Sequence, residues 1–269
     1  MNLEYLKNNW NNRPDPEIMA RIWDRASSDY AKKPLPDFQT NSFLKLISDT
    51  ADLNQNMSCL DIGCGSGSYS LALAPYVGSA VGVDLSSSMI ETAKRQKDEL
   101  GLSNVSFSCL DWDALDIRKA GYYRNFDLVF AKMTPAVCNY STFDKMIQCS
   151  RNLCYFQKNT RRHDQVLDTA LSLIGLPDWH QQTDEDIVNV FACLWLQGYE
   201  PQVFYHQEIW HPEKTLENAC AWCIDRAKLQ KEVTVGEEQI IRDYLSSIEM
   251  NGIVRETITT TIVTMYWKV

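Results

Sequence analysis

The residues best suited to do chemistry gather in the stretch CLDIGCGSGSYSLALA, residues 59–74. Asp61 stands at the end of an apolar run of strand type, and Gly63, Gly65 and Gly67 follow it in the turn before a helical pattern. Glycine accepts backbone conformations that other residues avoid and lets a ligand approach the backbone closely. Ligands of parallel α/β sheets bind beyond the carboxyl ends of the strands, so this turn is the first candidate binding site.

The glycine spacing separates two classes of cofactor. A dinucleotide-binding turn reads Gly-x-Gly-x-x-Gly, whereas here Gly67 comes one residue early and Ser68 holds the third position. Asp61 would lie beside the pyrophosphate of a dinucleotide, where the repulsion at low effective dielectric is on the order of several kcal/mol. A carboxylate suits a cationic ligand better, so a nicotinamide-dependent oxidoreductase is disfavoured.

Acids also end the next two strand-like runs. Asp84 ends the run SAVGVD, 23 residues after Asp61 (84 minus 61), near the offset at which an acid binds ribose hydroxyls in nucleotide-binding sheets. Asp111 and Trp112 follow VSFSCL and offer an acceptor for an exocyclic amine and an aromatic face for a purine. Three strand ends thus offer partners for an ammonium group, a ribose and an adenine, which S-adenosylmethionine combines without a phosphate.

With DIGCGSG, VGVDLS and CLDWDAL as its first three motifs, the chain resembles a class I S-adenosylmethionine-dependent methyltransferase of the small-molecule type. The resemblance implies S-adenosyl-L-methionine as the cofactor, with the glycine turn around its methionine part and Asp84 at its ribose. Asp111 and Trp112 would frame the adenine, and the residues after the fourth strand would line the methyl-donating end. The residues implied for the cofactor site are Asp61, Gly63, Cys64, Gly65, Gly67, Asp84, Leu85, Met89, Asp111, Trp112, Ala131 and Met133.

The sequence departs from one branch of that family after the fourth strand. Amino-directed nucleic-acid methyltransferases carry Asn/Asp-Pro-Pro-aromatic there, whereas this chain reads MTPA from Met133, so methylation of an exocyclic base nitrogen is disfavoured. The composition agrees, because 26 Lys+Arg against 35 Asp+Glu give a net charge of -9, which repels a phosphate backbone. We expect a small-molecule acceptor. A protein or tRNA methyltransferase and a non-catalytic binder of S-adenosylmethionine are the alternatives.

The acceptor side is less clearly marked. Direct methyl transfer needs positioning, and a general base is required only for an acceptor that is protonated at neutral pH. His206 and His211, close to a late strand, are the preferred catalytic base or acceptor-orienting pair, with a surface role as the alternative. The aromatic residues expected to line the substrate pocket, or else to pack between cap and sheet, are Trp23, Tyr30, Trp210 and Trp222.

The cysteines point to packing rather than to disulfides or metal. The chain has nine, an odd number, which does not suggest a secreted disulfide framework. Cys220 and Cys223 form a CxxC on a predicted helix, where two thiols could bind a soft metal or metalloid. A structural zinc site needs four ligands, and the apolar neighbours of these two cysteines favour a helix face that packs in the core, so no metal is expected. Cys64 is interpreted as a small filler.

The elements that must position these residues alternate between short apolar runs and helical patterns from Ser58 onward. This alternation predicts an α/β fold with a doubly wound, Rossmann-like, mostly parallel seven-stranded sheet. We expect a helical N-terminal cap over residues 1–50 and a methyltransferase domain over 51–269, with a helical insertion at about 212–232 before the last strand; the whole would form a single structural unit. The strand run NLCYF is expected to end at Phe156, where a basic segment begins.

Two further patterns concern the compartment. No apolar run approaches the roughly 20 residues that span a bilayer. The first residues lack the basic head and apolar stretch of a signal peptide. A cytoplasmic location, without a membrane or nucleic-acid partner, is therefore expected.

Overall fold

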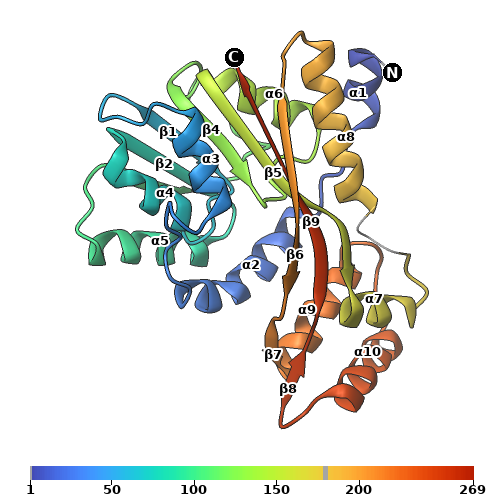
Figure 1. The fold of residues 1–269 in the computed structure, drawn as a ribbon. Coiled ribbons are helices and arrows are strands. Elements are labelled where there is room, and N and C mark those ends of the chain that lie inside the picture. Colours follow the sequence, from blue (N-terminus) through green and yellow to red (C-terminus); the bar gives the residue numbers. More distant parts are fainter. Residues whose placement is uncertain (1, 178–180) are drawn as a thin grey trace. The chain divides into compact units, whose positions relative to one another are not determined.

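A seven-stranded sheet organises the chain, which we describe from a computed structural model covering residues 2–177 and 181–269 (Figure 1). Its strand order is β3-β2-β1-β4-β5-β9-β6. β1 pairs in parallel with β2 and β4, β2 with β3, and β4 with β5, which confirms the predicted doubly wound, mostly parallel α/β fold. The strands are β1 (Ser58–Ile62), β2 (Ser79–Asp84), β3 (Val105–Cys109), β4 (Phe126–Lys132), β5 (Ser150–Asp164), β6 (Gln202–Trp210) and β9 (Ile258–Lys268).

Helices connect the strands and precede the sheet. A short 3-10 helix, η1 (Ala74–Tyr76), follows α4, and β7 (Glu213–Thr215) pairs antiparallel with β8 (Ile253–Arg255). Within the described residues, no helix has both the length and the apolar character to cross a bilayer. The helices are α1 (Leu3–Asn9), α2 (Pro16–Ala31), α3 (Ser42–Thr50), α4 (Ser68–Leu73), α5 (Ser87–Glu99), α6 (Tyr140–Cys149), α7 (Gln165–Ser172), α8 (Gln181–Leu196), α9 (Leu216–Lys228) and α10 (Val235–Ile248).

The chain divides into two compact units, in contrast to the single structural unit expected. Unit 1 comprises residues 1–158, 188–204 and 264–269, and unit 2 comprises 159–187 and 205–263. The expected N-terminal cap belongs to unit 1 with the glycine turn. The expected insertion at about 212–232 is only part of unit 2, because α7 and α10 pack with α9 around a core of their own.

The core of unit 1 explains why its strands are short and apolar. β1 lies between β2 and β4, with Leu60 facing Val81 on one side and Val129 on the other. Leu60 and Ile62 are fully buried, as expected for a strand covered on both faces. The loop that follows Ile62 is therefore held by a rigid central strand.

Strand β5 is longer than the sequence indicates. The expected end at Phe156 is wrong, because the strand continues through the basic segment to Asp164. Polar residues in this stretch are buried, including Thr160 and Asp164, and the Thr260 hydroxyl donates to the Thr160 carbonyl at 3.1 Å. Strand structure persists there because polar groups find hydrogen-bond partners, which a reading of apolar runs does not register.

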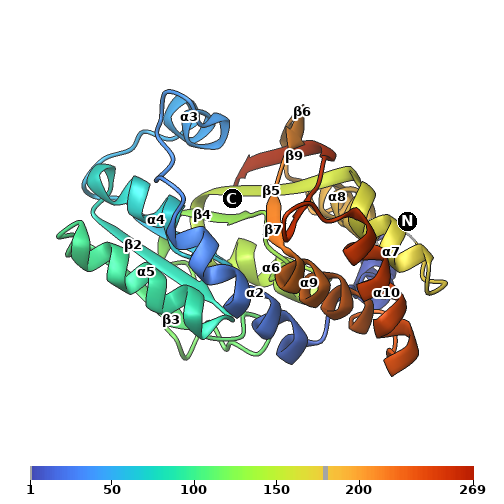
Figure 2. The ribbon, with the colours of Figure 1, turned by 90° about the horizontal axis from the view of Figure 1, so that it is seen from below.

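Helix α2 is well defined by its own sequence. The Asp15 side chain accepts hydrogen bonds from the backbone N–H groups of Glu17 and Ile18, and Pro16 takes the first helical position. The helix packs along α5, and Figure 2 shows the two running beside each other. This contact brings N-terminal residues to the carboxyl end of β2.

Candidate functional site

The glycine turn is shaped by packing as much as by ligand access. Gly63 and Gly67 adopt φ angles of 69° and 78°, which favour glycine. A Cβ on Gly63 would lie 1.9 Å from the Thr134 hydroxyl, and one on Gly67 would lie 2.6 Å from the Phe107 ring. A Cβ on Gly65 would meet only the Met89 sulfur, at 3.9 Å. Two glycines thus serve the fit of the turn to its neighbours, while Gly65 leaves a cradle that a ligand could fill.

Backbone hydrogen bonds fix this turn to the end of β2. The N–H groups of Gly63 and Cys64 donate to the Val83 carbonyl at 2.8 and 3.0 Å. The Gly65 N–H donates to Asp84 Oδ2 at 2.8 Å, and the Ser86 N–H donates to Asp84 Oδ1 at the same distance. Each oxygen of Asp84 therefore has one N–H donor and keeps a lone pair for a further donor.

A second carboxylate, on helix α2, lies close to Asp84. The Asp24 carboxylate on α2 accepts from the Ser86 hydroxyl at 2.5 Å and from the Ser88 N–H at 3.1 Å. Burial raises the pKa of Asp84, and the nearby charge of Asp24 raises it further, while the backbone donors Ser86 and Gly65 act in the opposite direction. This corner of the site thus carries excess negative charge.

Asp61 lies buried below the turn. It is 4% exposed and accepts one hydrogen bond from the Ser70 hydroxyl at 2.7 Å. Burial raises the pKa of Asp61 to about 7, with a smaller contribution from Asp84 in the same direction and an opposing one from Lys132. Among the described residues, neither Asp61 nor Asp84 has a cation at ion-pair distance, so the two acids favour a positively charged ligand.

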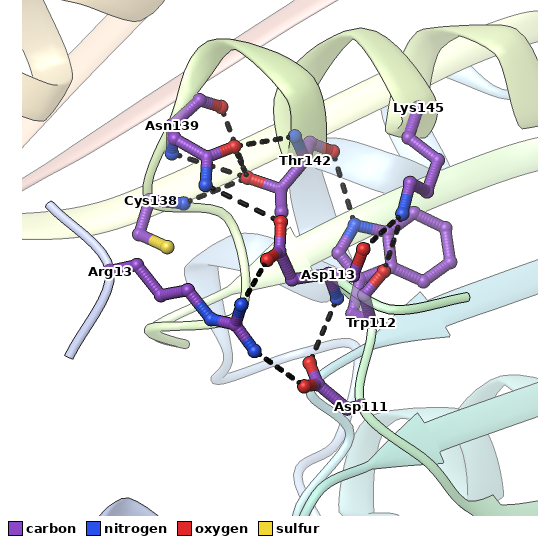
Figure 3. A network of polar contacts seen from close by, with 8 residues as sticks. All are labelled: Arg13, Asp111, Trp112, Asp113, Cys138, Asn139, Thr142 and Lys145. Carbon is purple, nitrogen blue, oxygen red and sulfur yellow. Dashed lines mark hydrogen bonds and ion pairs between the residues drawn. The ribbon is translucent and has the colours of Figure 1, made fainter. Parts of the chain in front are cut away.

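The third strand end carries a polar network that the sequence does not reveal (Figure 3). Arg13, between α1 and α2, reaches Asp111 Oδ2 at 2.7 Å and Asp113 Oδ2 at 2.6 Å. Asp111 also accepts the Asp113 N–H at 2.9 Å. An amine of a bound purine would therefore share the Asp111 carboxylate with Arg13.

Trp112 is packed as a core residue. It is 3% exposed, its indole N–H donates to the Thr142 carbonyl at 3.1 Å, and the Lys145 ammonium lies 5.8 Å from the ring centre (Figure 3). Lys145 also donates to the carbonyls of Trp112 and Asp113 at 2.8 Å. In this arrangement the indole offers little surface to a purine, and the predicted contact of Trp112 with the adenine stays a prediction.

The remaining predicted cofactor residues lie around the same turn. Met133 has a φ of 53°, an uncommon conformation for a residue with a side chain, and its N–H donates to the Gln157 carbonyl at 2.8 Å. Ala131 and Met89 are buried, and Leu85 and Cys64 are partly buried. Burial raises the pKa of the Cys64 thiol, which agrees with a filler rather than a nucleophile. Their contact with a cofactor stays a prediction.

The predicted catalytic and pocket residues fall in different units. In unit 2, His206 Nε2 lies 2.8 Å from Glu208 Oε1, and the Trp210 indole donates to Glu208 Oε2 at 2.6 Å. His211 is exposed and lies 3.4 Å from the Thr257 hydroxyl. Trp222 packs there against the guanidinium of Arg226.

In unit 1, the rings of Trp23 and Tyr30 lie 6.2 Å apart, edge to face, both on α2. These two residues share a unit with the glycine turn, whereas His206, His211, Trp210 and Trp222 belong to unit 2. The proposed roles of all six in catalysis or acceptor binding stay predictions.

No metal site emerges from the part of the chain that the structure describes: no group of three or more His, Cys, Asp or Glu residues is arranged to hold an ion. Cys220 and Cys223 are free thiols, 3% and 0% exposed, within the core of α7, α9 and α10. Burial raises the pKa of both thiols. The packing interpretation of the CxxC agrees with this position.

Comparison with known proteins assigns the class. A family profile described as "Methyltransferase domain" matches residues 53–170, the segment from just before β1 to α7. This segment of the chain therefore matches a methyltransferase domain, and the sheet order of the structure agrees with a class I S-adenosylmethionine-dependent methyltransferase fold.

Individual relatives are more distant. Aklanonic acid methyltransferase DauC of Streptomyces sp. (strain C5) is 32% identical over 114 residues, covering 41% of this chain and 49% of its own length. The chain thus spans about half the length of this curated relative. Geranyl diphosphate C-methyltransferase from Streptomyces coelicolor A3(2), solved with Mg²⁺, geranyl diphosphate and S-adenosyl-L-homocysteine, superimposes with a TM-score of 0.51 at 12% identity over 93% of this chain and 96% of its own.

A second solved structure carries a different activity on the same fold. The cyclase SpnF superimposes with a TM-score of 0.50 at 14% identity, over 93% of this chain and 96% of its own. Both superpositions demonstrate the fold alone. The reaction must therefore be argued from the site.

Proposed function

We propose that this protein transfers a methyl group from S-adenosylmethionine to a small-molecule acceptor. The observation that carries the proposal is the Asp84 carboxylate, held by two backbone N–H groups beside the Gly65 cradle, with both oxygens able to accept a second donor. A vicinal ribose diol supplies two such donors. The nearby Asp61 adds a buried negative charge suited to the methionine ammonium.

The cofactor fits the residues present. Gly65 leaves room where a side chain would intrude, and among the described residues neither Asp61 nor Asp84 has a cation at ion-pair distance, which suits a positively charged ligand. Bound S-adenosylmethionine supplies a methyl group made electrophilic by the adjacent sulfonium. Asp84 would hold the ribose, Asp61 the ammonium end and Asp111 the adenine amine.

The chain's contribution to the reaction is positioning. The acceptor atom forms its bond to the methyl carbon as the carbon–sulfur bond breaks, the electron pair stays on sulfur, and no covalent enzyme intermediate is required. Alignment of the two reactants can lower the barrier by up to roughly 7 to 11 kcal/mol. An acceptor hydroxyl would also need a base for its proton, and His206 or His211 is our proposal for that role.

The acidic balance supports a small acceptor over RNA. The net charge of -9 opposes binding of a phosphate backbone, and DauC is by its name a small-molecule methyltransferase. A protein or tRNA acceptor is the alternative. Incubation with labelled S-adenosylmethionine and separate metabolite, protein and tRNA fractions distinguishes them, because only one fraction should gain the label.

A second experiment tests the role of the Asp84 carboxylate in cofactor binding. Asp84→Asn keeps the size of the side chain but removes its charge and one acceptor oxygen, so we expect the Kd for S-adenosylhomocysteine to rise by roughly 10- to 150-fold, the equivalent of about 1.5–3 kcal/mol. Calorimetry measures it. Asp98→Asn, on the exposed end of α5, is the matched control and should leave the Kd unchanged.

Two results would refute the proposal. An unchanged Kd in folded Asp84→Asn protein removes the ribose role. Tight binding of S-adenosylmethionine without transfer of label to any fraction would indicate a non-catalytic binder, or a reaction other than methylation as in the structurally similar cyclase.

A further inference from the structure

Strand β6 forms one edge of the seven-stranded sheet. It is the last strand in the order, next to β9, so in the part of the chain that the structure describes no strand pairs with its outer side. The outward backbone N–H and C=O groups of an edge strand can pair with another strand, and proteins often guard such an edge with lysine or proline. The nine residues of β6, QVFYHQEIW, contain no lysine, arginine or proline. This edge is therefore open to a further strand.

The part of β6 in unit 2 also exposes apolar side chains. Side chains alternate along a strand, so Tyr205, Gln207 and Ile209 share one face. Tyr205 is 77% exposed and Ile209 is 62% exposed, with the exposed Gln207 between them. The opposite face carries a polar pair, in which His206 Nε2 lies 2.8 Å from Glu208 Oε1. Aromatic and β-branched residues on an unpaired strand favour its addition to a sheet.

Two copies of one strand can pair antiparallel about a two-fold axis in only a few registers. Facing residues must point to the same face of the joined sheet, so one residue always lies opposite its own copy. Near the middle of β6 that residue could be His206, Gln207 or Glu208. Centring the pair on Glu208 would place two carboxylates face to face, which is destabilising. Centring it on His206 would place the Glu208 carboxylate opposite the Phe204 ring.

The register centred on Gln207 makes the strand complementary to itself. Tyr205 then lies opposite Ile209 of the second copy, and His206 lies opposite Glu208 of the second copy. An aromatic residue that faces a β-branched one stabilises paired strands, and an imidazole can donate to a carboxylate opposite it. The two-fold symmetry forms each pair twice. This register therefore covers both exposed apolar side chains and places each acid opposite an imidazole.

We propose that this chain forms a homodimer in which the β6 strands of two copies pair antiparallel about Gln207. The backbone groups of the two edges bond to each other, so the two sheets become continuous and neither β6 edge stays free. A second copy is the partner because the same strand supplies the complementary side chains. This inference concerns assembly and does not depend on the proposed methyl transfer.

The first measurement is the mass of the wild type in solution, by light scattering after size exclusion. We expect twice the mass of one chain at micromolar concentration. A monomer at every concentration would overturn the proposal, including the case in which an unrelated strand covers this edge.

A cysteine at the two-fold axis tests the register. Facing residues of antiparallel strands have Cα atoms about 4.5–5.5 Å apart, a separation that a disulfide spans. In a Cys109→Ser background, which removes an exposed native thiol, Gln207→Cys should cross-link two chains under glutathione disulfide. The matched control is Gln202→Cys, at the exposed start of β6, which would lie opposite Pro212 of the second copy and should stay uncross-linked. Equal cross-linking of the two variants would overturn the proposed register.

Charge changes at the apolar pair test the contact itself. Tyr205→Lys with Ile209→Lys places lysine opposite lysine at both symmetry-related positions, so the Kd of the dimer should rise by about tenfold or more. Tyr205→Glu with Ile209→Glu should weaken the dimer equally. An equimolar mixture of the two double variants should regain the dimer mass, because each lysine then faces a glutamate. Far-UV circular dichroism checks that each variant is folded.

Two further outcomes would contradict the proposal. A wild-type dimer that persists in both double variants would place the interface on another surface. A mixture of folded double variants that stays monomeric would show that residues 205 and 209 do not face each other across the axis.

Discussion

Both units of the chain bury carboxylates, but they compensate them differently. In unit 2, Asp164 pairs with Arg162 at 2.9 Å, and Glu256 pairs with Lys214 at 3.3 Å. The Asp164 and Glu256 side chains are almost fully buried, and the positive charges come from the protein itself. Burial and the nearby charge of Asp164 raise the pKa of Glu256, while Lys214 and Arg162 act in the opposite direction, so removing either cation would leave the two buried carboxylates with too little positive charge.

Around the glycine turn, the donors are neutral. Asp61 receives a hydroxyl, and Asp84 receives two backbone N–H groups. Hydrogen bonds of this kind fix the orientation of a carboxylate without cancelling its charge. The difference suggests that the acids of unit 2 complete the fold, whereas those of unit 1 await a cation from outside. The predictions below test this contrast.

The largest effect is expected from Lys214→Met. This change leaves Glu256 buried without its cation, so the free energy of unfolding should fall by about 3–5 kcal/mol in urea denaturation. The Kd for S-adenosylhomocysteine should stay unchanged. Adding Glu256→Gln should restore most of the stability, and a loss below about 1 kcal/mol in the single variant would contradict an internally paired site.

An uncharged substitution in the core of unit 2 serves as a comparison for the ion-pair variants. Cys223→Ser places a hydroxyl among apolar neighbours of α7, α9 and α10, so we expect a loss of about 1–3 kcal/mol in unfolding free energy with unchanged methyl transfer. Loss of activity in a folded variant would show that the thiol takes part in the reaction and would reopen the metal or metalloid interpretation of the CxxC.

The pH dependence of stability probes the uncompensated acid. Because the pKa of Asp61 is raised to about 7 in the folded protein, the folded state holds this proton more tightly than the unfolded chain. The contribution of the Asp61 proton to the free energy of unfolding is therefore fully present below about pH 4 and is lost as the pH rises through about 7. Cofactor-free wild type should therefore lose more stability between pH 5 and pH 8 than Asp61→Asn does.

The same titration should act on binding in the opposite direction. S-adenosylmethionine affinity should increase as the pH rises through about 7, since a cation favours the ionised carboxylate. Urea denaturation and calorimetry at several pH values measure the two trends. Identical pH profiles for wild type and Asp61→Asn would exclude Asp61 as their source.

The smallest effect is expected at an exposed pair. Arg13 bridges Asp111 and Asp113 with 38% of its side chain exposed, so Arg13→Gln should lower the unfolding free energy by less than about 1 kcal/mol. The loss should shrink further at high salt. If Arg13→Gln lowered the unfolding free energy as much as Lys214→Met does, solvent exposure would not explain the difference in strength between these ion pairs.

Local patterns carried most of the fold prediction. Strands β1 to β4 and the turn at Gly63 follow from short apolar runs ended by acids, because buried parallel strands and tight turns impose their demands on consecutive residues. The contacts of the site between residues far apart in the chain leave no pattern in the sequence, so they could not be predicted. Asp24 meets Ser86 from 62 positions away, and Arg13 meets Asp111 from 98 positions away.

Two other differences have physical causes. β5 runs past Phe156 because buried polar residues such as Thr160 satisfy their hydrogen bonds, so hydropathy alone ends it early. Trp112 packs in the core because its indole N–H finds the Thr142 carbonyl, a contact that sequence cannot distinguish from a free aromatic face.

The six residues 264–269 return to unit 1 after the chain has built unit 2. Trp267 is 1% exposed and lies 5.7 Å from the Phe143 ring, while the Tyr266 ring stacks on Tyr155 at 5.5 Å. A fragment ending at Lys158 would therefore lack two aromatic side chains of its own interior, and a fusion or deletion near residue 264 would disturb the domain that holds the glycine turn. Ribosomal synthesis must pass residue 267 before this interior can close.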